Sequence, residues 1–294
     1  MLQAVAPRTG PFAAEHVTTL AITRMVSMTF PVGRTRLDDD VSLDFMPDVA
    51  RAAGVGFRPE VIRRPGNTFA AMTEALVPEL GTLAGGVDLA LLAHVTPDAV
   101  PSEVAGPVIT AALPGEPSSF AVTDNGLSAP YTALALAQRY ARRCGFHRIV
   151  LFLFDQASSP FDIEASPVQR VDGDAAVALV LERPGPGDAG GFEVRQESGV
   201  AANDVAARLT ESWRELSAGT PALFLGPGVD ADWAPPVDAA RVHHLAAGFP
   251  GTGVWRALGD HWNRSESQTA VLMDYDPACG DLSVCRVHRG HPAA

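Results

Sequence analysis

The sequence predicts an α/β protein in which helices pack against sheets in layers. Apolar segments of strand character alternate with segments of helical character over most of the 294 residues. One Pro/Gly-rich connector, RPGPGDAGG at 183–191, interrupts this alternation. After it, the chain again runs through strand, helix, strand, helices and two strands. We therefore expect two similar halves, residues 1–183 and residues 191–294.

The elements of the first half follow from local signals. Thr68 or Asn67 is expected to cap an amphipathic helix, and Pro97 and Pro101 fix the backbone after a strand so that Ser102 can cap the next helix. Strands are predicted at 17–30, 87–93, 120–123, 147–154 and 175–182, with a short extended segment at 61–64. Helices are predicted at 46–53, 69–84, 102–113 and 129–144.

The second half is predicted by the same periodicities. Strands are expected at 191–198, 222–226, 270–274 and 282–288. Helices are expected at 204–217, 237–244 and 253–262.

Composition limits the partners that this chain can have. It has 22 Lys and Arg against 34 Asp and Glu, a net charge of −12, which argues against nucleic acid or anionic lipid as the main partner. A local basic cluster remains at Arg139, Arg142, Arg143 and Arg148. The three cysteines form no CxxC pair, and we see neither a signal peptide nor an apolar run of membrane-spanning length. We therefore expect a cytoplasmic protein.

The segment 120–136 holds the main candidate site. A strand ends in the tight turn Asp124-Asn125-Gly126, and a helix of small residues begins at Ser128 or Ala129. A nucleophile on the first turn of a helix is favoured, because unpaired N–H groups and the helix dipole stabilise its anion. Ser128 could be such a nucleophile if a base activates it, or it could simply cap the helix.

Four ordered segments resemble the thiolase superfamily, and most closely its ketoacyl-(acyl-carrier-protein)-synthase-III branch. They are the strand and Thr-Pro-Asp turn at 87–102, the turn and helix at 120–136, DGDAAVALVL at 172–181, and ACGDLSV at 278–284. The resemblance implies a thiolase-like fold: two βαβαβαββ halves that form a layered α-β-α-β-α core.

The resemblance also implies where catalytic residues should lie. The family's nucleophilic Cys would fall at Leu127 or Ser128. Its His would follow the strand at 221–225, where this chain has Gly226, and its Asn would fall at Gly251 or a neighbour. Ser128 is therefore the candidate nucleophile. His243, His244 and His94 are the candidate bases, each with an ordinary structural role as the alternative.

Two functions remain open at this point. One is an atypical acyltransferase of polyketide or other specialised-metabolite biosynthesis that acts on acyl-CoA or acyl-carrier-protein thioesters through Ser128. The other is a catalytically silent subunit that pairs with an active ketosynthase homologue, as chain-length factors do. Either would be a homodimer or a heterodimer. We expect no cofactor and no metal, since Cys285, His288 and His291 have ligand-like spacing but no fourth ligand.

Overall fold

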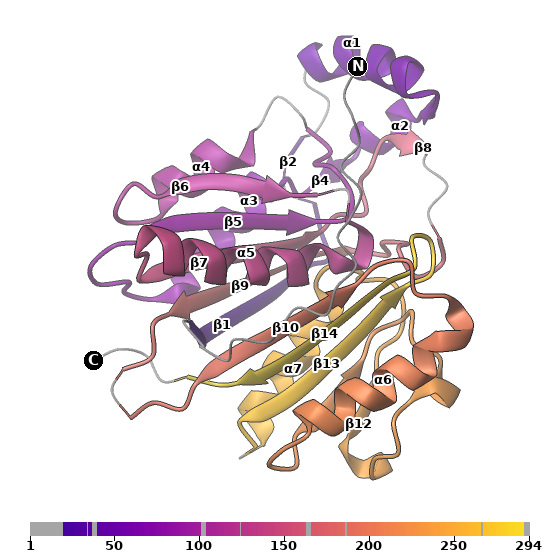
Figure 1. Cartoon of the computed structure of the whole chain (residues 1–294). Coiled ribbons are helices and arrows are strands. Elements are labelled where there is room, and N and C mark those ends of the chain that lie inside the picture. Colours follow the sequence, from indigo (N-terminus) through magenta and orange to yellow (C-terminus); the bar gives the residue numbers. More distant parts are fainter. Residues whose placement is uncertain are drawn as a thin grey trace, which may run out of the picture.

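Two five-stranded mixed sheets form the centre of the protein. The computed structural model describes residues 20–33, 35–36, 40–100, 104–123, 125–162, 166–185, 187–265 and 267–290. The first sheet has the order β1-β9-β7-β5-β6, and the second has the order β10-β14-β13-β11-β12 (Figure 1). The strands of the first sheet are β1 (Ala21–Phe30), β5 (Leu89–His94), β6 (Ser118–Val122), β7 (Arg148–Asp155) and β9 (Asp174–Glu182). Those of the second are β10 (Gly191–Glu197), β11 (Ala222–Leu225), β12 (Val242–His244), β13 (Thr269–Asp276) and β14 (Asp281–His288).

The two sheets have the same pattern of strand directions. In each, the first three strands pair antiparallel, and the last two pairings are parallel. The middle strands β7, β9 and β13 are buried along nearly their whole length, as expected for strands that are covered on both faces.

Helices cover both faces of both sheets. Side chains of α5 (Ala129–Cys144) and α7 (Gly253–Arg264) join one apolar cluster with residues of both sheets, so these two helices lie between the sheets. The helices α3 (Phe69–Leu76) and α4 (Ala105–Ala112) cover the outer face of the first sheet, and α6 (Ala202–Leu216) covers that of the second. The predicted α-β-α-β-α layering is confirmed.

A small satellite lies at one end of the first sheet (Figure 1). It contains α1 (Asp40–Ala53), α2 (Pro59–Ile62) and the two-stranded ribbons β2 (Thr35–Arg36) with β4 (Pro65–Gly66) and β3 (Gly56–Phe57) with β8 (Phe161–Asp162). Its separate apolar core includes Met46, Ile62 and Phe161.

Several of the predicted elements differ in the structure. The helix predicted at 46–53 begins earlier, at Asp40, and the helix predicted at 102–113 begins at Ala105, with Val104 as its N-cap residue. The helix predicted at 237–244 is wrong: a 3-10 turn, Ala239–Arg241, leads into strand β12, whose Val242 pairs with Leu223. The extended segment predicted at 61–64 is wrong at its start, because α2 begins at Pro59, a residue suited to the first turn of a helix. The helix predicted at 69–84 ends at Leu76, and Pro78 lies in the 3-10 turn Val77–Leu80 that follows. Ser102, Asp124, His291 and the start of the strand predicted at 17–30 lie outside the described residues.

The order of elements shows how the halves correspond. The first sheet and its helices follow the order β1, α3, β5, α4, β6, α5, β7, β9. The second follows β10, α6, β11, β12, α7, β13, β14, with short 3-10 turns where α4 stands in the first. Hence α7 corresponds to α5, and β13 corresponds to β7.

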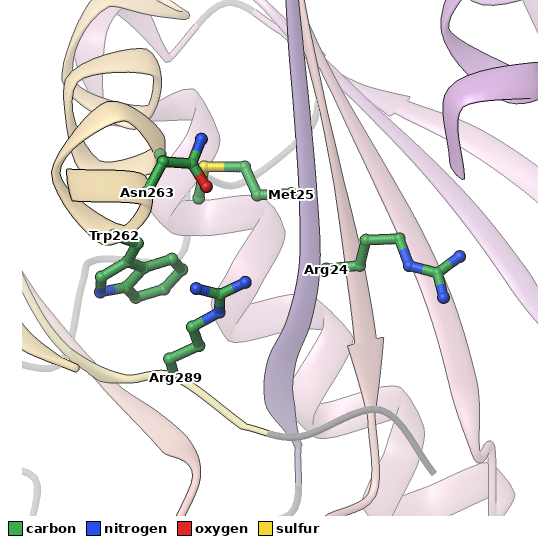
Figure 2. A pocket seen from close by; sticks show the side chains of 6 residues that line it. Arg24, Met25, Trp262, Asn263 and Arg289 are labelled. Atoms are coloured by element: carbon green, nitrogen blue, oxygen red, sulfur yellow. The ribbon is translucent and has the colours of Figure 1, made fainter. Parts of the chain in front are cut away.

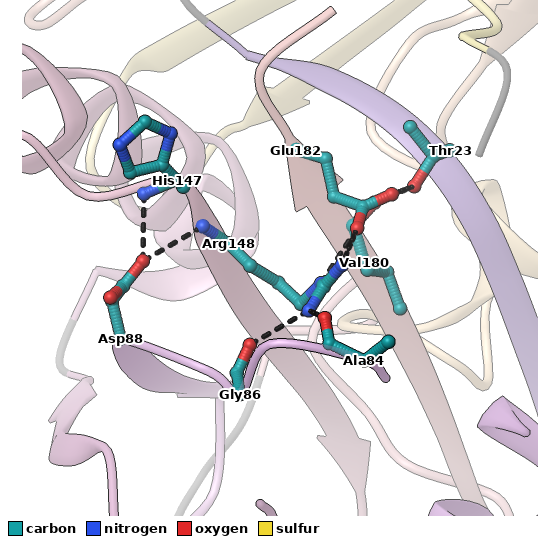
Figure 3. Close-up of polar contacts among 8 residues, drawn as sticks. All are labelled: Thr23, Ala84, Gly86, Asp88, His147, Arg148, Val180 and Glu182. Carbon is teal, nitrogen blue, oxygen red and sulfur yellow. Dashed lines mark hydrogen bonds and ion pairs between the residues drawn. The ribbon is translucent and has the colours of Figure 1, made fainter. Parts of the chain in front are cut away.

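A buried ion pair holds three strands of the first sheet together at one end (Figure 3). Arg148 of β7 donates to Glu182 of β9 through Nε at 2.6 Å, and Thr23 of β1 donates to the other oxygen of Glu182 at 2.6 Å. The Arg148 guanidinium also donates to the carbonyl oxygens of Ala84 and Gly86. These four interactions satisfy the carboxylate and the guanidinium, whose side chains are 9% and 16% exposed.

Candidate functional site

The sharp turn after β6 brings Ser128 into the interior. The 3-10 turn Gly126–Ser128 leads directly into α5, and Gly126 adopts a positive φ of 47° that favours glycine. The Ser128 side chain is 3% exposed and makes no capping bond to α5. Its Oγ instead lies 2.9 Å from Oγ of Ser283 on β14. Ser283 is a hydroxyl and not a base, so this contact does not by itself activate Ser128.

A buried carboxylate occupies the start of this helix. Oδ2 of Asp276 accepts hydrogen bonds from the backbone N–H of Leu127 at 3.0 Å and from Nε2 of Gln169 at 2.7 Å. Its Oδ1 accepts from the N–H of Ala278 at 3.0 Å. A Cβ at Gly126 would overlap with Oδ2 of Asp276, so the glycine is required for this approach. The Leu127 N–H, which this turn would otherwise offer to an anion, is therefore already engaged by the protein's own carboxylate.

A second carboxylate fills the space beside Gly226, which follows β11. A Cβ built on Gly226 would overlap with the carboxyl group of Asp274. Asp274 is 2% exposed, and burial is the main cause that raises its pKa well above the ordinary value. In the strand register Asp274 lies directly opposite Ser283, but its carboxyl group packs toward Gly226 on the other side of β13. Among the described residues, no hydrogen bond joins its carboxyl group to Ser128 or to Ser283.

A third carboxylate binds the start of α7. Asp155 accepts from the backbone N–H groups of Gly251 and Thr252, each at 2.8 Å, and from the Thr252 hydroxyl at 2.6 Å. Burial raises the pKa of Asp155 to about 6, against the opposing effect of these hydrogen bonds. The described acidic residues, together with the described His and Cys, form no group that could hold a metal ion.

The three candidate histidines do not lie at Ser128. His94 is on the face of β5 that packs against α3, where its ring lies 5.0 Å from that of Phe69, while Nδ1 lies 2.8 Å from the carbonyl oxygen of Thr96. His244 is exposed on β12, three strands from Ser283, which is on the order of 14 Å. Its side chain lies on the same face as Val242, which packs toward α6 and away from α5.

His243 lies on the inner face of β12 but has other neighbours. Its ring stacks on Phe224 at 4.6 Å and lies 5.5 Å from the ring of His261 on α7. Burial and the charge of Arg264 lower the pKa of His243.

A chain of amides and hydroxyls leads outward from Ser128. Nε2 of Gln196 on β10 lies 3.3 Å from Oγ of Ser283 and 3.0 Å from Oγ1 of Thr132, and it also donates to the carbonyl of Ser128. Asn125 donates to the same Thr132 oxygen at 2.7 Å. These groups are neutral, and they position the turn without offering a proton acceptor of adjustable pKa.

Two hollows in the described part of the chain lie away from this turn. The hollow in Figure 2 measures about 20 Å³ between β1 and α7, and the guanidinium of Arg289 lies 5.7 Å from the centre of the Trp262 ring at its wall. A volume of this size holds about one water molecule. The second measures about 280 Å³ between β10 and α6 and is lined by the ion-paired side chains of Arg195, Arg208 and Glu215. Ser128 lines neither hollow.

Comparison with solved structures defines the class of fold to which these two layered halves belong. The protein has the thiolase-like fold of ketosynthase-III-type proteins. A 3-oxoacyl-(acyl-carrier-protein) synthase III matches 92% of this chain and 99% of its own, at a TM-score of 0.59 and 15% identity. The β-ketoacyl-(acyl-carrier-protein) synthase III of Thermus thermophilus matches 77% of this chain and 86% of its own, at a TM-score of 0.59 and 15% identity. An OleA variant of Xanthomonas campestris, bound with cerulenin, matches 97% of this chain and 100% of its own, at a TM-score of 0.60 and 14% identity.

At such low identity these matches establish the fold alone. No protein-family model matches the chain, and a search of curated proteins found no match. None of the described helices is long and apolar enough to cross a membrane.

Gly126, Gly226 and Gly251 could be recognised in the sequence, whereas the carboxylates beside them were not recognised. Asp155, Asp274 and Asp276 all come at or just before the end of an apolar strand, where buried polar residues of α/β proteins often gather. Their position at the ends of apolar strands was the signal in the sequence that could have identified these aspartates. The sequence did not show that each carboxylate would lie against Gly251, Gly226 or Gly126, because the partners are 48 to 150 residues apart.

Proposed function

We propose that this protein is a non-acylating thiolase-fold subunit of thioester metabolism that pairs with an active ketosynthase-type enzyme. The observation that carries the proposal is the Asp276 carboxylate, which accepts the N–H of Leu127 at the start of α5. In an acyl transfer, N–H groups at this place would stabilise the negative charge that develops on the thioester oxygen. A fixed carboxylate takes up that donor and repels such a charge.

The surroundings of Ser128 support the same conclusion. To form an ester, Ser128 would have to lose its proton to a base while the thiolate leaves, but the side chain at hydrogen-bond distance from its oxygen is the Ser283 hydroxyl. According to the resemblance, Gly226 stands where relatives have a catalytic His, and Gly251 or a neighbour stands where they have an Asn. Asp274 packs against the first of these glycines, and Asp155 binds the N–H of the second. Losing a nucleophile or its base lowers rates by several powers of ten.

The open edge of the first sheet offers a place for the partner subunit. Among the described residues, β6 pairs with β5 on one side only, so its other edge presents free backbone groups. Ala121 is exposed on this strand, and Phe120 is partly buried against Tyr140 of α5. The inferred partner is a second thiolase-fold chain with an intact nucleophile. In this arrangement the present chain supports the partner's binding of acyl-CoA or acyl-carrier-protein thioesters in polyketide, fatty acid or related biosynthesis.

The test for acylation is direct. The protein is incubated with acetyl-CoA and octanoyl-CoA, and its intact mass is measured. We expect no added acyl mass. An adduct that is absent in Ser128→Ala and retained in the control Ser212→Ala overturns the proposal.

That adduct would favour the second candidate function, an atypical acyltransferase with Ser128 as the acyl acceptor. The observation that favours this alternative is the burial of the Ser128 hydroxyl at the start of α5, turned inward and not bonded to the helix.

The pairing is tested separately. The protein is mixed with a ketosynthase-type enzyme from the same organism, and the complex is measured by sedimentation velocity. Ala121→Lys on β6 is expected to weaken the complex at least tenfold, since it places a charge on the contact strand, while Ala207→Lys on the exposed face of α6 leaves it unchanged. Equal effects of the two variants would place the contact elsewhere and contradict this arrangement.

A further inference from the structure

The far end of α5 carries an unusual concentration of positive charge for a protein of net charge −12. Arg139, Arg142 and Arg143 lie on its last two turns, and all three are exposed. Spacings of three and four residues place Arg142 and Arg143 beside Arg139 on the helix surface. Within the described ranges, no acidic side chain pairs with any of the three. We refer to these residues as the arginine end of α5.

The helix does not need these arginines to terminate. Gly145 ends α5 in the left-handed conformation, with φ of 74°. Arg183, from the end of β9, donates to the carbonyl oxygen of Ala141 at 2.7 Å and to that of Phe146 at 3.1 Å. Gly145 and Arg183 therefore provide the interactions that end α5. What remains for Arg142 and Arg143 within the fold is a weak, solvent-screened interaction with the helix dipole.

Two acidic residues that bind the chain just after α5 are used internally (Figure 3). Asp88 accepts from the backbone N–H of His147 at 2.7 Å and from that of Arg148 at 2.9 Å. Glu182 is paired with Arg148 at 2.5 Å. Neither carboxylate neutralises the arginine end of α5, so this end of the molecule remains locally positive.

A row of partly exposed aromatic rings lies beside the arginines. The ring of Tyr140 lies 5.5 Å from that of Phe120 and 6.1 Å from that of Phe146, which stacks on it. Tyr140 and Arg143 are three residues apart and share one side of the helix. Arginine and tyrosine next to each other on an otherwise acidic surface are the residue types most enriched at the centres of protein interfaces.

We propose that the arginine end of α5, together with Tyr140, binds an acidic surface of another protein. The matching surface has two or three carboxylates within one to two helical turns and an apolar side chain that contacts the tyrosine. An extended polyanion fits less well, because the net charge of −12 repels it outside the patch while the arginines act only over about 8 Å. This site lies about 20 Å from Ser128 along α5 and does not depend on the chemistry there.

The test uses a defined probe. A fluorescein-labelled helical peptide of 16 residues, with glutamates at i and i+4 and one central leucine, is titrated with the full chain and followed by fluorescence anisotropy. The triple variant Arg139→Glu, Arg142→Glu, Arg143→Glu is compared with Arg63→Glu, Arg64→Glu, Arg214→Glu. Both change the net charge equally, and the control arginines are exposed elsewhere.

We expect the first triple variant to bind the peptide at least tenfold more weakly than the wild type, and the control to bind within twofold. Binding of the wild type should weaken between 50 and 300 mM NaCl. If the peptide does not bind the wild type, or binds both triple variants equally, the proposal is wrong. It is equally wrong if patch-dependent binding is seen only with a 20-nucleotide RNA or with phosphatidylglycerol vesicles. Circular dichroism verifies folding, and Arg142→Gln with a smaller expected loss replaces the triple variant if that one unfolds.

Discussion

Asp155 and Asp276 occupy corresponding positions and bind each other's half of the molecule. Asp155 is the last residue of β7 and binds the start of α7, whereas Asp276 is the last residue of β13 and binds the start of α5. Since β7 corresponds to β13 and α5 to α7, each half supplies the carboxylate that caps the central helix of the other. The two helix starts that face the middle of the fold are therefore each bound by a carboxylate from the other half.

The cap on α5 should contribute measurably to stability. Asp276→Asn keeps the shape of the side chain but turns an N–H₂ group toward at least one of the donors of Leu127, Gln169 and Ala278. We expect the free energy of unfolding in urea to fall by about 1–3 kcal/mol. Asp260→Asn serves as the control, because its ion pair with Arg264 is exposed and should change stability by less than about 0.5 kcal/mol. Equal losses in the two variants would show that the cap is not stabilising.

The close packing of Gly226 predicts a specific pattern of coupling. Gly226→Ala introduces a methyl group into the space of the Asp274 carboxyl group and should destabilise the protein by about 1–3 kcal/mol. In the Asp274→Ala background the same change should be nearly neutral, so a double-mutant cycle gives a coupling energy of that size. Gly185→Ala, which meets no neighbouring atom, provides the control. Additive effects of the two substitutions would contradict the packing described here.

The pKa of Asp155 predicts a pH dependence of stability. Burial raises this pKa from 3.8 to about 6, so between these values the folded protein retains a proton that the unfolded chain releases. Protonated Asp155 therefore contributes roughly 3 kcal/mol to the free energy of unfolding. This contribution is complete below about pH 4 and is lost as pH rises through 6. Urea unfolding of the wild type and Asp155→Asn from pH 4 to 7 measures it. The stability of the wild type relative to the variant should fall across this range, and a constant difference would show that the pKa is not raised.

Much of the fold could be predicted from the residues themselves. Buried strands such as β7 and β9 are continuous apolar runs, and the periodicity of α5 together with Gly145 marks a helix and its end. Local pattern failed at 237–244. There Val242 becomes part of a strand only because β11 offers a parallel partner, which is a tertiary effect.

The site was less accessible to the same reasoning. Ser128 was correctly placed at the turn before α5, but its neighbours come from β13, β14 and β10. Which bases, acids or hydroxyls meet there depends on how the two halves dock, and no spacing within 120–136 encodes that. The assignment of His94, His243 or His244 as a base depended on such a meeting. The structure puts the three residues at other places in the sheets.

The buried ion pair in the first sheet gives a further prediction. Arg148→Met alone leaves the carboxylate of Glu182, whose side chain is 9% exposed, without its counter-charge. We expect a loss of about 3–5 kcal/mol in the free energy of unfolding. The double variant Arg148→Met, Glu182→Leu should recover much of it, because no unpaired charge remains. Arg51→Met, which breaks the exposed contact with Asp48, should cost under about 0.5 kcal/mol; a similar cost for Arg148→Met would refute the prediction.

Asp155 and Asp276, which each bind the central helix of the opposite half, also determine whether the two halves can fold separately. A fragment ending within 183–191 would contain α5 without the carboxylate that completes its first turn, and the remaining fragment would lack the one that completes α7. Each piece would also expose the apolar side of its central helix. Neither piece should be stable alone, whereas the two mixed together should reconstitute the native spectrum. The intact chain should accordingly melt in a single cooperative transition.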